Sequence, residues 1–117
     1  MLEKQKRTFI MSIKRISNFQ ARKHVQACEP FKANNIFAEW VYPNKYVVYS
    51  YGKHFPLFVF DADSNVWAEN EDKYSVTTSK HRTQSHPLCN TIRLNTRTMR
   101  ELAETNILLE KMIGELV

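Results

Sequence analysis

Residues 35–51 read NIFAEWVYPNKYVVYSY, and this stretch decides the fold class. The side chains over 35–42 alternate between two faces, which is the two-residue period of a β-strand. The Pro-Asn-Lys sequence at 43–45 is typical of a turn, and residues 46–51 are almost all β-branched or aromatic. Because the connection has hairpin length, we expect 35–42 and 46–51 to pair as antiparallel strands.

The same pattern continues toward the C-terminus. Gly52 marks a turn, and residues 57–60 are predicted to form a third strand, with Pro56 at its entry, where a missing backbone donor is tolerated. A turn over 61–65 and a short fourth strand over 66–68 follow. Sequential hairpins of this kind predict an antiparallel meander of three or four strands.

Helices are expected on either side of this meander. The S-x-x-Q pattern at 17–20 is a capping box that predicts a helix to about Ala27, which Pro30 ends. Thr77 or Thr78 is expected to cap a short helix that runs to Ser85, and residues 88–94 are expected to form a short extended piece.

A T-x-x-E capping box at 98–101 predicts a helix of about 17 residues that ends near Leu116. The expected fold is therefore α+β, with a small antiparallel sheet of three to four strands, an N-terminal helix and a longer C-terminal amphipathic helix. Residues 1–10 have no clear period and are interpreted as a disordered or added extension, and residues 11–117 as a single α+β domain.

The apolar positions of the C-terminal helix leave two interpretations open. They follow a 3-4 heptad spacing, with one polar position that can fix the register of a dimer. The pattern fits a helix packed on its own sheet, and it also fits a homodimer. The candidate dimer interface comprises Met99, Leu102, Asn106, Leu109, Ile113 and Leu116.

Charge is distributed in blocks along the 117 residues, whose net charge is +5. Residues 1–23 carry net +6 and residues 73–100 carry net +6 without a single acid, whereas 24–72 and 101–117 are acidic. Basic segments of this kind suit phosphates or an acidic protein surface.

The sequence contains no run of 18 apolar residues, which a membrane-spanning helix would need. The start also lacks a signal-peptide pattern. We therefore expect a cytoplasmic protein with no membrane partner.

The central region combines an aromatic stretch that begins at Phe31 with YVVYSYG at 46–52 and KYSVTTSKH at 73–81. In this combined pattern it resembles a family of small phage and prophage proteins of unknown function. It covers about residues 31–87 and implies a phage or mobile-element origin in the cytoplasm of a bacterial host. It implies no activity, catalytic residue or cofactor.

A segment rich in hydroxyl groups is the main candidate site. Small hydroxyls at a helix start can bind an anion, Lys and Arg can add charge, and a tyrosine can stack on a base; the same hydroxyls can equally cap turns. The candidate phosphate or nucleic-acid residues are Tyr74, Ser75, Thr77, Thr78, Lys80, His81, Arg82 and Gln84, joined by Arg15, Arg22, Lys23, Arg93 and Arg97 from the two basic segments.

Other chemistry finds less support in the sequence. The histidines and Cys89 lack zinc-ligand spacing, and no nucleophile elbow, P-loop or dinucleotide motif occurs. We therefore assign no metal site, no cofactor and no catalytic residue. The aromatic side chains of the strands offer a stacking platform if one sheet face is open, and form core if helices cover it.

Three functional hypotheses follow. The first is a non-catalytic phage accessory protein that binds and inhibits a host protein or protein–nucleic-acid complex, such as a bacterial defence nuclease, in the manner of an anti-CRISPR protein. The second is a direct DNA- or RNA-binding protein that uses the two basic segments. The third is an enzyme or nucleotide-binding protein centred on Thr77, Thr78 and His81.

Overall fold

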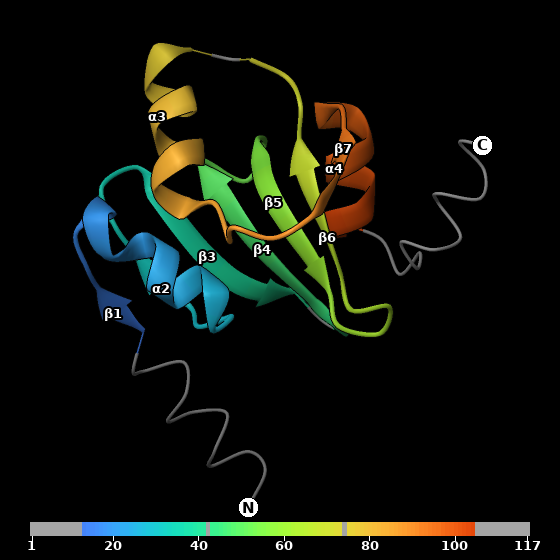
Figure 1. The fold of residues 1–117 in the computed structure, drawn as a ribbon, viewed down its shortest axis with the longest axis horizontal. Helices are drawn as coiled ribbons and strands as arrows, with labels where there is room; N and C mark the ends of the chain where they lie inside the picture. The colour runs from blue at the N-terminus through green and yellow to red at the C-terminus, as the bar shows by residue number, and fades with distance from the viewer. Residues whose placement is uncertain (1–12, 42, 74, 105–117) are drawn as a thin grey trace, which may run out of the picture.

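The computed structural model describes residues 13–41, 43–73 and 75–104, and its core is one seven-stranded mixed sheet (Figure 1). The strands lie in the sheet in sequence order, from β1 to β7. Their bounds are β1 Lys14–Arg15, β2 Phe31–Lys32, β3 Ile36–Val41, β4 Lys45–Ser50, β5 Pro56–Asp61, β6 Val66–Asn70 and β7 Thr91–Leu94; the helices are η1 Asn18–Gln20, α2 Ala21–Gln26, α3 Val76–Ser85 and α4 Thr96–Glu104.

The centre of the sheet is the antiparallel meander β3–β4–β5–β6, which lies where the alternating sequence pattern places strands. Each of these strands pairs with the next through a short turn. The pairing of β4 with β5 shifts register between Val48 and Tyr49. All six residues of β4 are buried, because helices cover both faces of this strand.

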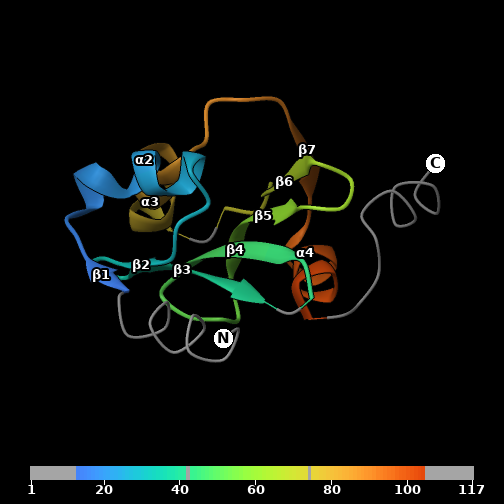
Figure 2. The same ribbon diagram turned by 90° about the horizontal axis from the view of Figure 1, so that it is seen from below.

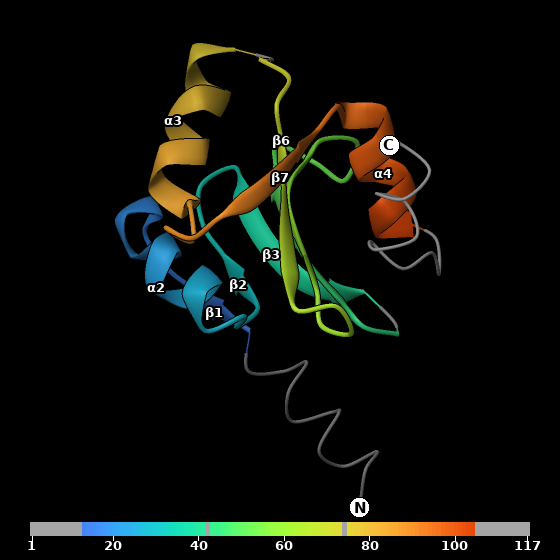
Figure 3. The same ribbon diagram turned by 45° about the vertical axis from the view of Figure 1, so that its right-hand side comes forward.

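The expectation of a small, purely antiparallel sheet of three to four strands is wrong, because three further strands extend it. β2 continues the antiparallel order beside β3. β1 joins β2 in parallel, and β7 joins β6 in parallel. Figure 3 shows β7 alongside β6. Parallel neighbours need a crossover connection, which η1 and α2 provide at one edge and α3 at the other.

The helices lie in two layers, one on each side of the sheet (Figure 2). Both crossovers pass over the same face, so η1 and α2 contact α3 there. α4 packs on the opposite face, mainly against β5 and β6. The result is a helix–sheet–helix sandwich in which neither face of the central strands is open.

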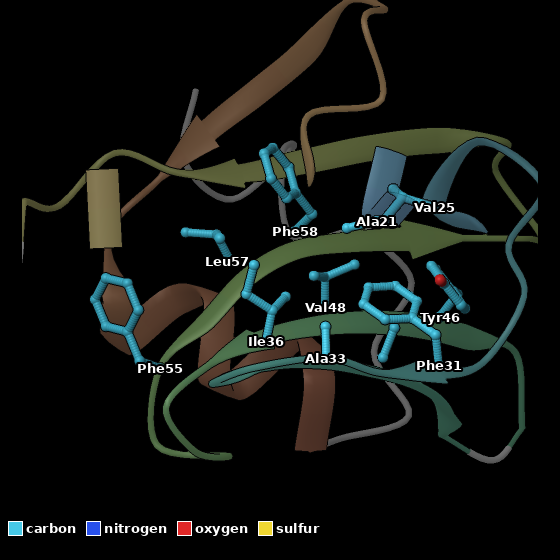
Figure 4. Close-up of a cluster of buried hydrophobic side chains, with 11 residues drawn as sticks. Ala21, Val25, Phe31, Ala33, Ile36, Tyr46, Val48, Phe55, Leu57 and Phe58 are labelled. Atoms are coloured by element: carbon cyan, nitrogen blue, oxygen red, sulfur yellow. The ribbon is translucent and has the colours of Figure 1, made fainter. Parts of the chain in front are cut away.

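Each face of the sheet has its own apolar core. The core under α2 contains aromatic rings from several strands, among them Phe31, Tyr46 and Phe58 (Figure 4). The core under α4 combines Val47, Val59, Ala68, Leu94, Met99 and Leu102 with neighbouring side chains. The aromatic side chains buried in these two cores are therefore packing residues, whereas Trp40 on β3 is 39% exposed.

The start of α4 also differs from the sequence expectation. The helix begins at Thr96 rather than after Thr98. Asn95 accepts a hydrogen bond from the backbone N–H of Thr98 (2.8 Å) and so occupies the capping position. Asn, Ser and Thr all favour this position, so sequence alone could not choose among Asn95, Thr96 and Thr98. The part of the predicted helix beyond Glu104 lies outside the described residues.

Candidate functional site

The hydroxyl-rich segment forms the first turn of α3, and Ser75 caps it. The hydroxyl oxygen of Ser75 accepts a hydrogen bond from the backbone N–H of Thr78 (3.0 Å). The expected caps, Thr77 and Thr78, are therefore wrong by two or three positions. Thr78 is buried against the fold, while Thr77 is exposed. Tyr74, the predicted stacking residue, lies outside the described residues.

His81 is a buried structural histidine. Its Nδ1 lies 2.8 Å from the hydroxyl of Ser50, and its ring packs beside that of Tyr51. Burial lowers the pKa of His81, so the ring is neutral at neutral pH. Ser50 is only 1% exposed, so this Ser–His pair is closed to solvent and serves to join α3 to the end of β4.

Arg82 and His86 converge on a buried carboxylate, that of Glu69 on β6. The Nε2 of His86 lies 3.1 Å from one carboxylate oxygen, which also accepts a hydrogen bond from the hydroxyl of Thr91 (2.8 Å). The Nε of Arg82 lies 3.9 Å from the other oxygen. These contacts hold α3, β6 and β7 together around Glu69.

Both ring nitrogens of His86 take part in hydrogen bonds. The backbone N–H of Leu88 donates to Nδ1 (2.9 Å), so Nε2 carries the proton that is donated to Glu69. The Nη2 of Arg82 donates to the backbone carbonyl of Asp72 (2.7 Å). These contacts fit a role for both side chains in positioning the second crossover.

Arg22, a predicted nucleic-acid contact, binds the C-terminal end of α3. Its guanidinium donates to the backbone carbonyls of Thr83 and His86, the latter at 3.0 Å from Nε. Gln26 donates in the same way to the carbonyl of Pro87 (3.1 Å). A cation at the C-terminus of a helix satisfies free carbonyls and the helix dipole, so Arg22 joins the two crossover helices.

The structure divides the remaining predicted basic residues. Lys23 and Lys80 are exposed on the neighbouring helices α2 and α3. Arg15 is exposed on the edge strand β1. Arg93 is exposed on β7, and Arg97 lies on α4, where it pairs with Glu101 at 3.7 Å. The two basic segments therefore meet where α2 contacts α3, whereas Arg97 belongs to the opposite layer.

The η1–α2–α3 layer contains no Asp or Glu anywhere in its three helices. Its solvent side carries Lys23 and Lys80 among uncharged polar side chains and one exposed aromatic ring. Gln84 lies partly buried on the inner side of α3. We give the name basic helical face to six exposed residues of these helices: Phe19, Gln20, Lys23, Ser79, Lys80 and Thr83. Gln26, Val76 and Thr77 are also exposed on the same helices.

Phe19 is the functional candidate that sequence reasoning missed. It is 88% exposed, more than any other large apolar side chain among the described residues. It lies inside the S-x-x-Q capping box, which predicts a helix start but not the side of the helix that stays in solvent. Nothing in the local pattern could have separated it from a core phenylalanine.

The predicted dimer residues fall into two groups. Met99 and Leu102 are fully buried in the core between α4 and the sheet. Asn106, Leu109, Ile113 and Leu116 lie outside the described residues, so the homodimer stays a prediction.

Comparisons with protein-family models, with curated proteins and with solved structures found no significant match. The resemblance to small phage proteins therefore stays a prediction. Within residues 13–41, 43–73 and 75–104, no helix is long and apolar enough to cross a membrane. In the same ranges, no three His, Cys, Asp or Glu side chains gather as a metal-binding group.

Proposed function

We propose that this protein is a non-catalytic binding protein that contacts nucleic acid through the basic helical face. The observation that carries the proposal is the η1–α2–α3 layer, which joins parts of both basic segments and whose three helices contain no Asp or Glu. The nearby carboxylate of Glu29, which follows α2, lies 3.1 Å from Nδ1 of His24. Phosphate backbones attract surfaces of this kind, since each Lys that neutralises a phosphate releases a condensed counterion.

The buried groups beneath this face support binding rather than catalysis. His81 and His86 are held by Ser50 and by Glu69, and Arg82 is held by a backbone carbonyl and the Glu69 carboxylate. A general base needs a free nitrogen within reach of a substrate proton. These rings instead fix α3 rigidly on the sheet, and a rigid element is a good scaffold for a recognition surface.

Inhibition of a host defence complex, the first hypothesis from the sequence, is retained as the setting in which such binding would act. The positive charge of the basic helical face limits which component of a host complex it would bind. Protein channels that hold nucleic acid are themselves basic, and a basic face would repel them. Within a protein–nucleic-acid complex, the basic helical face matches the nucleic-acid component.

The test is fluorescence anisotropy of a labelled 20-nucleotide probe across a salt series, with wild type and the double variant K23Q/K80Q. The slope of log K against log salt is negative, and we expect it to become shallower by about 1.4 to 1.8 in the double variant, because two phosphate contacts are lost. The matched control is R93Q/R97Q, which likewise removes two exposed cations, here arginines of the same predicted set.

The control separates the outcomes. If both double variants lose the same amount of salt slope, binding does not depend on the basic helical face. It then uses another surface or only the net charge of the protein. Absence of salt-dependent binding by the wild type, together with recovery of a nuclease-resistant protein complex from a bacterial lysate, would overturn nucleic-acid binding and favour a protein target.

A further inference from the structure

The most exposed aromatic ring of the described chain, that of Phe19, is held on a rigid support. The backbone N–H of Ser17 donates to Oε1 of Gln20 (3.2 Å), which closes the capping box around Phe19. Asn18 makes two hydrogen bonds with the backbone of Asn34, at 3.1 and 2.9 Å. The ring therefore projects into solvent from a backbone that is fixed on both sides.

A second exposed aromatic side chain, that of Tyr51, lies beside the β2–β3 turn, which contains Asn34. Its backbone N–H donates to the carbonyl of Asn35 (2.8 Å), the residue that follows the partner of Asn18. Its side chain is 46% exposed, and its ring lies 5.4 Å from that of His81 on α3, at an angle of 45°. The chain next to Phe19 and the backbone of Tyr51 thus bind neighbouring residues of the β2–β3 turn, Asn34 and Asn35.

Two exposed lysines lie on the helices that adjoin η1. η1 continues directly into α2, which carries Lys23, and η1 also contacts α3, which carries Lys80. Single-strand-binding surfaces combine cations that follow the phosphates with aromatic rings that stack on successive bases. Bases within a duplex already stack on each other, so an exposed ring has no base face to meet there.

We propose that Phe19 and Tyr51 stack on unpaired bases, and that the ligand of the basic helical face is single-stranded nucleic acid. This inference rests on the proposed function and adds the class of ligand. Lys23 and Lys80 supply affinity for the phosphates of any strand, while the two rings supply the preference for unpaired bases.

The experiment compares F19A and Y51A with wild type on a 20-nucleotide single strand and on the matching duplex, by anisotropy at one salt concentration. We expect F19A to weaken single-strand binding by roughly 5- to 100-fold, with a smaller loss for Y51A, because stacking on an aromatic side chain is lost. Duplex binding and the salt slope should stay unchanged. The stacking-preserving variants F19W and Y51F should keep single-strand affinity.

The outcomes distinguish this inference from the proposed function. If K23Q/K80Q weakens binding while F19A does not, or if F19A weakens single-strand and duplex binding equally, the stacking inference is overturned and phosphate binding stands. If the wild type binds neither probe, the proposed function fails as well. Far-ultraviolet circular dichroism of F19A checks that the fold is intact, as expected for an exposed side chain.

Discussion

His81 shows how a residue that the sequence offers for chemistry is used to hold the fold. Its buried ring faces Ser50 and Tyr51, and burial lowers its pKa below the ordinary value of 6.5. As the pH falls below 6.5, the unfolded chain therefore takes up a proton before the folded chain does. We expect the free energy of unfolding to decrease from pH 7.5 to pH 5.0, by at most about 1.4 kcal/mol per pH unit from this one site.

Urea unfolding of wild type and His81→Gln at both pH values measures this contribution. Gln keeps a polar group near Ser50 but does not titrate, so the variant should lose less stability on acidification than wild type. Identical pH dependence in the two proteins would mean that His81 does not contribute. The pKa of Asp72 is also lowered, by hydrogen bonds from Thr96, but its ordinary value is 3.8, so its effect falls in a separate and more acidic range.

At the scale of the elements, the two crossover helices depend on each other through Arg22. Its guanidinium donates to two carbonyls at the end of α3, more than 60 residues away along the chain. Arg22→Ala should lower the free energy of unfolding by about 1–2 kcal/mol, since two charge-assisted hydrogen bonds are lost from a partly exposed site. Urea denaturation measures the change.

Lys23→Ala is the matched control, because the neighbouring lysine is exposed and outside these contacts. It should change stability by less than about 0.5 kcal/mol, while it weakens nucleic-acid binding. A loss of stability as large for Lys23→Ala as for Arg22→Ala would contradict the assignment of Arg22 to the end of α3.

The same elements show which features a sequence can and cannot predict. The meander could be predicted, because β3 alternates, β4 and β5 are rich in β-branched and aromatic residues, and turn residues separate the strands. β1 and β2 have two residues each, too few to show a period. The sequence predicts an extended segment over 88–94, but its parallel pairing with β6 depends on the path of α3. The partners of Arg22 and Arg82 are likewise set by that path, so the sequence predicts them only as phosphate or nucleic-acid contacts and does not show their hydrogen bonds within the fold.

At the scale of the whole molecule, the helix–sheet–helix arrangement explains the apolar positions of α4. Met99 and Leu102 are fully buried in the core that α4 forms with the sheet. Residues that fill a monomer's core stabilise it independently of protein concentration, whereas dimer contacts stabilise it by mass action. The heptad spacing at these two positions is therefore explained by packing on β5 and β6.

Leu102→Ala should accordingly lower the free energy of unfolding by about 2–5 kcal/mol, through lost burial and the cavity that remains. Urea denaturation at two protein concentrations tenfold apart measures it, with the exposed Arg100→Ala as the control on the same helix. The difference between wild type and Leu102→Ala should be the same at both concentrations. A difference that grows with concentration would instead assign Leu102 to an interface between two chains, and would restore the dimer as the reason for the apolar stripe on α4.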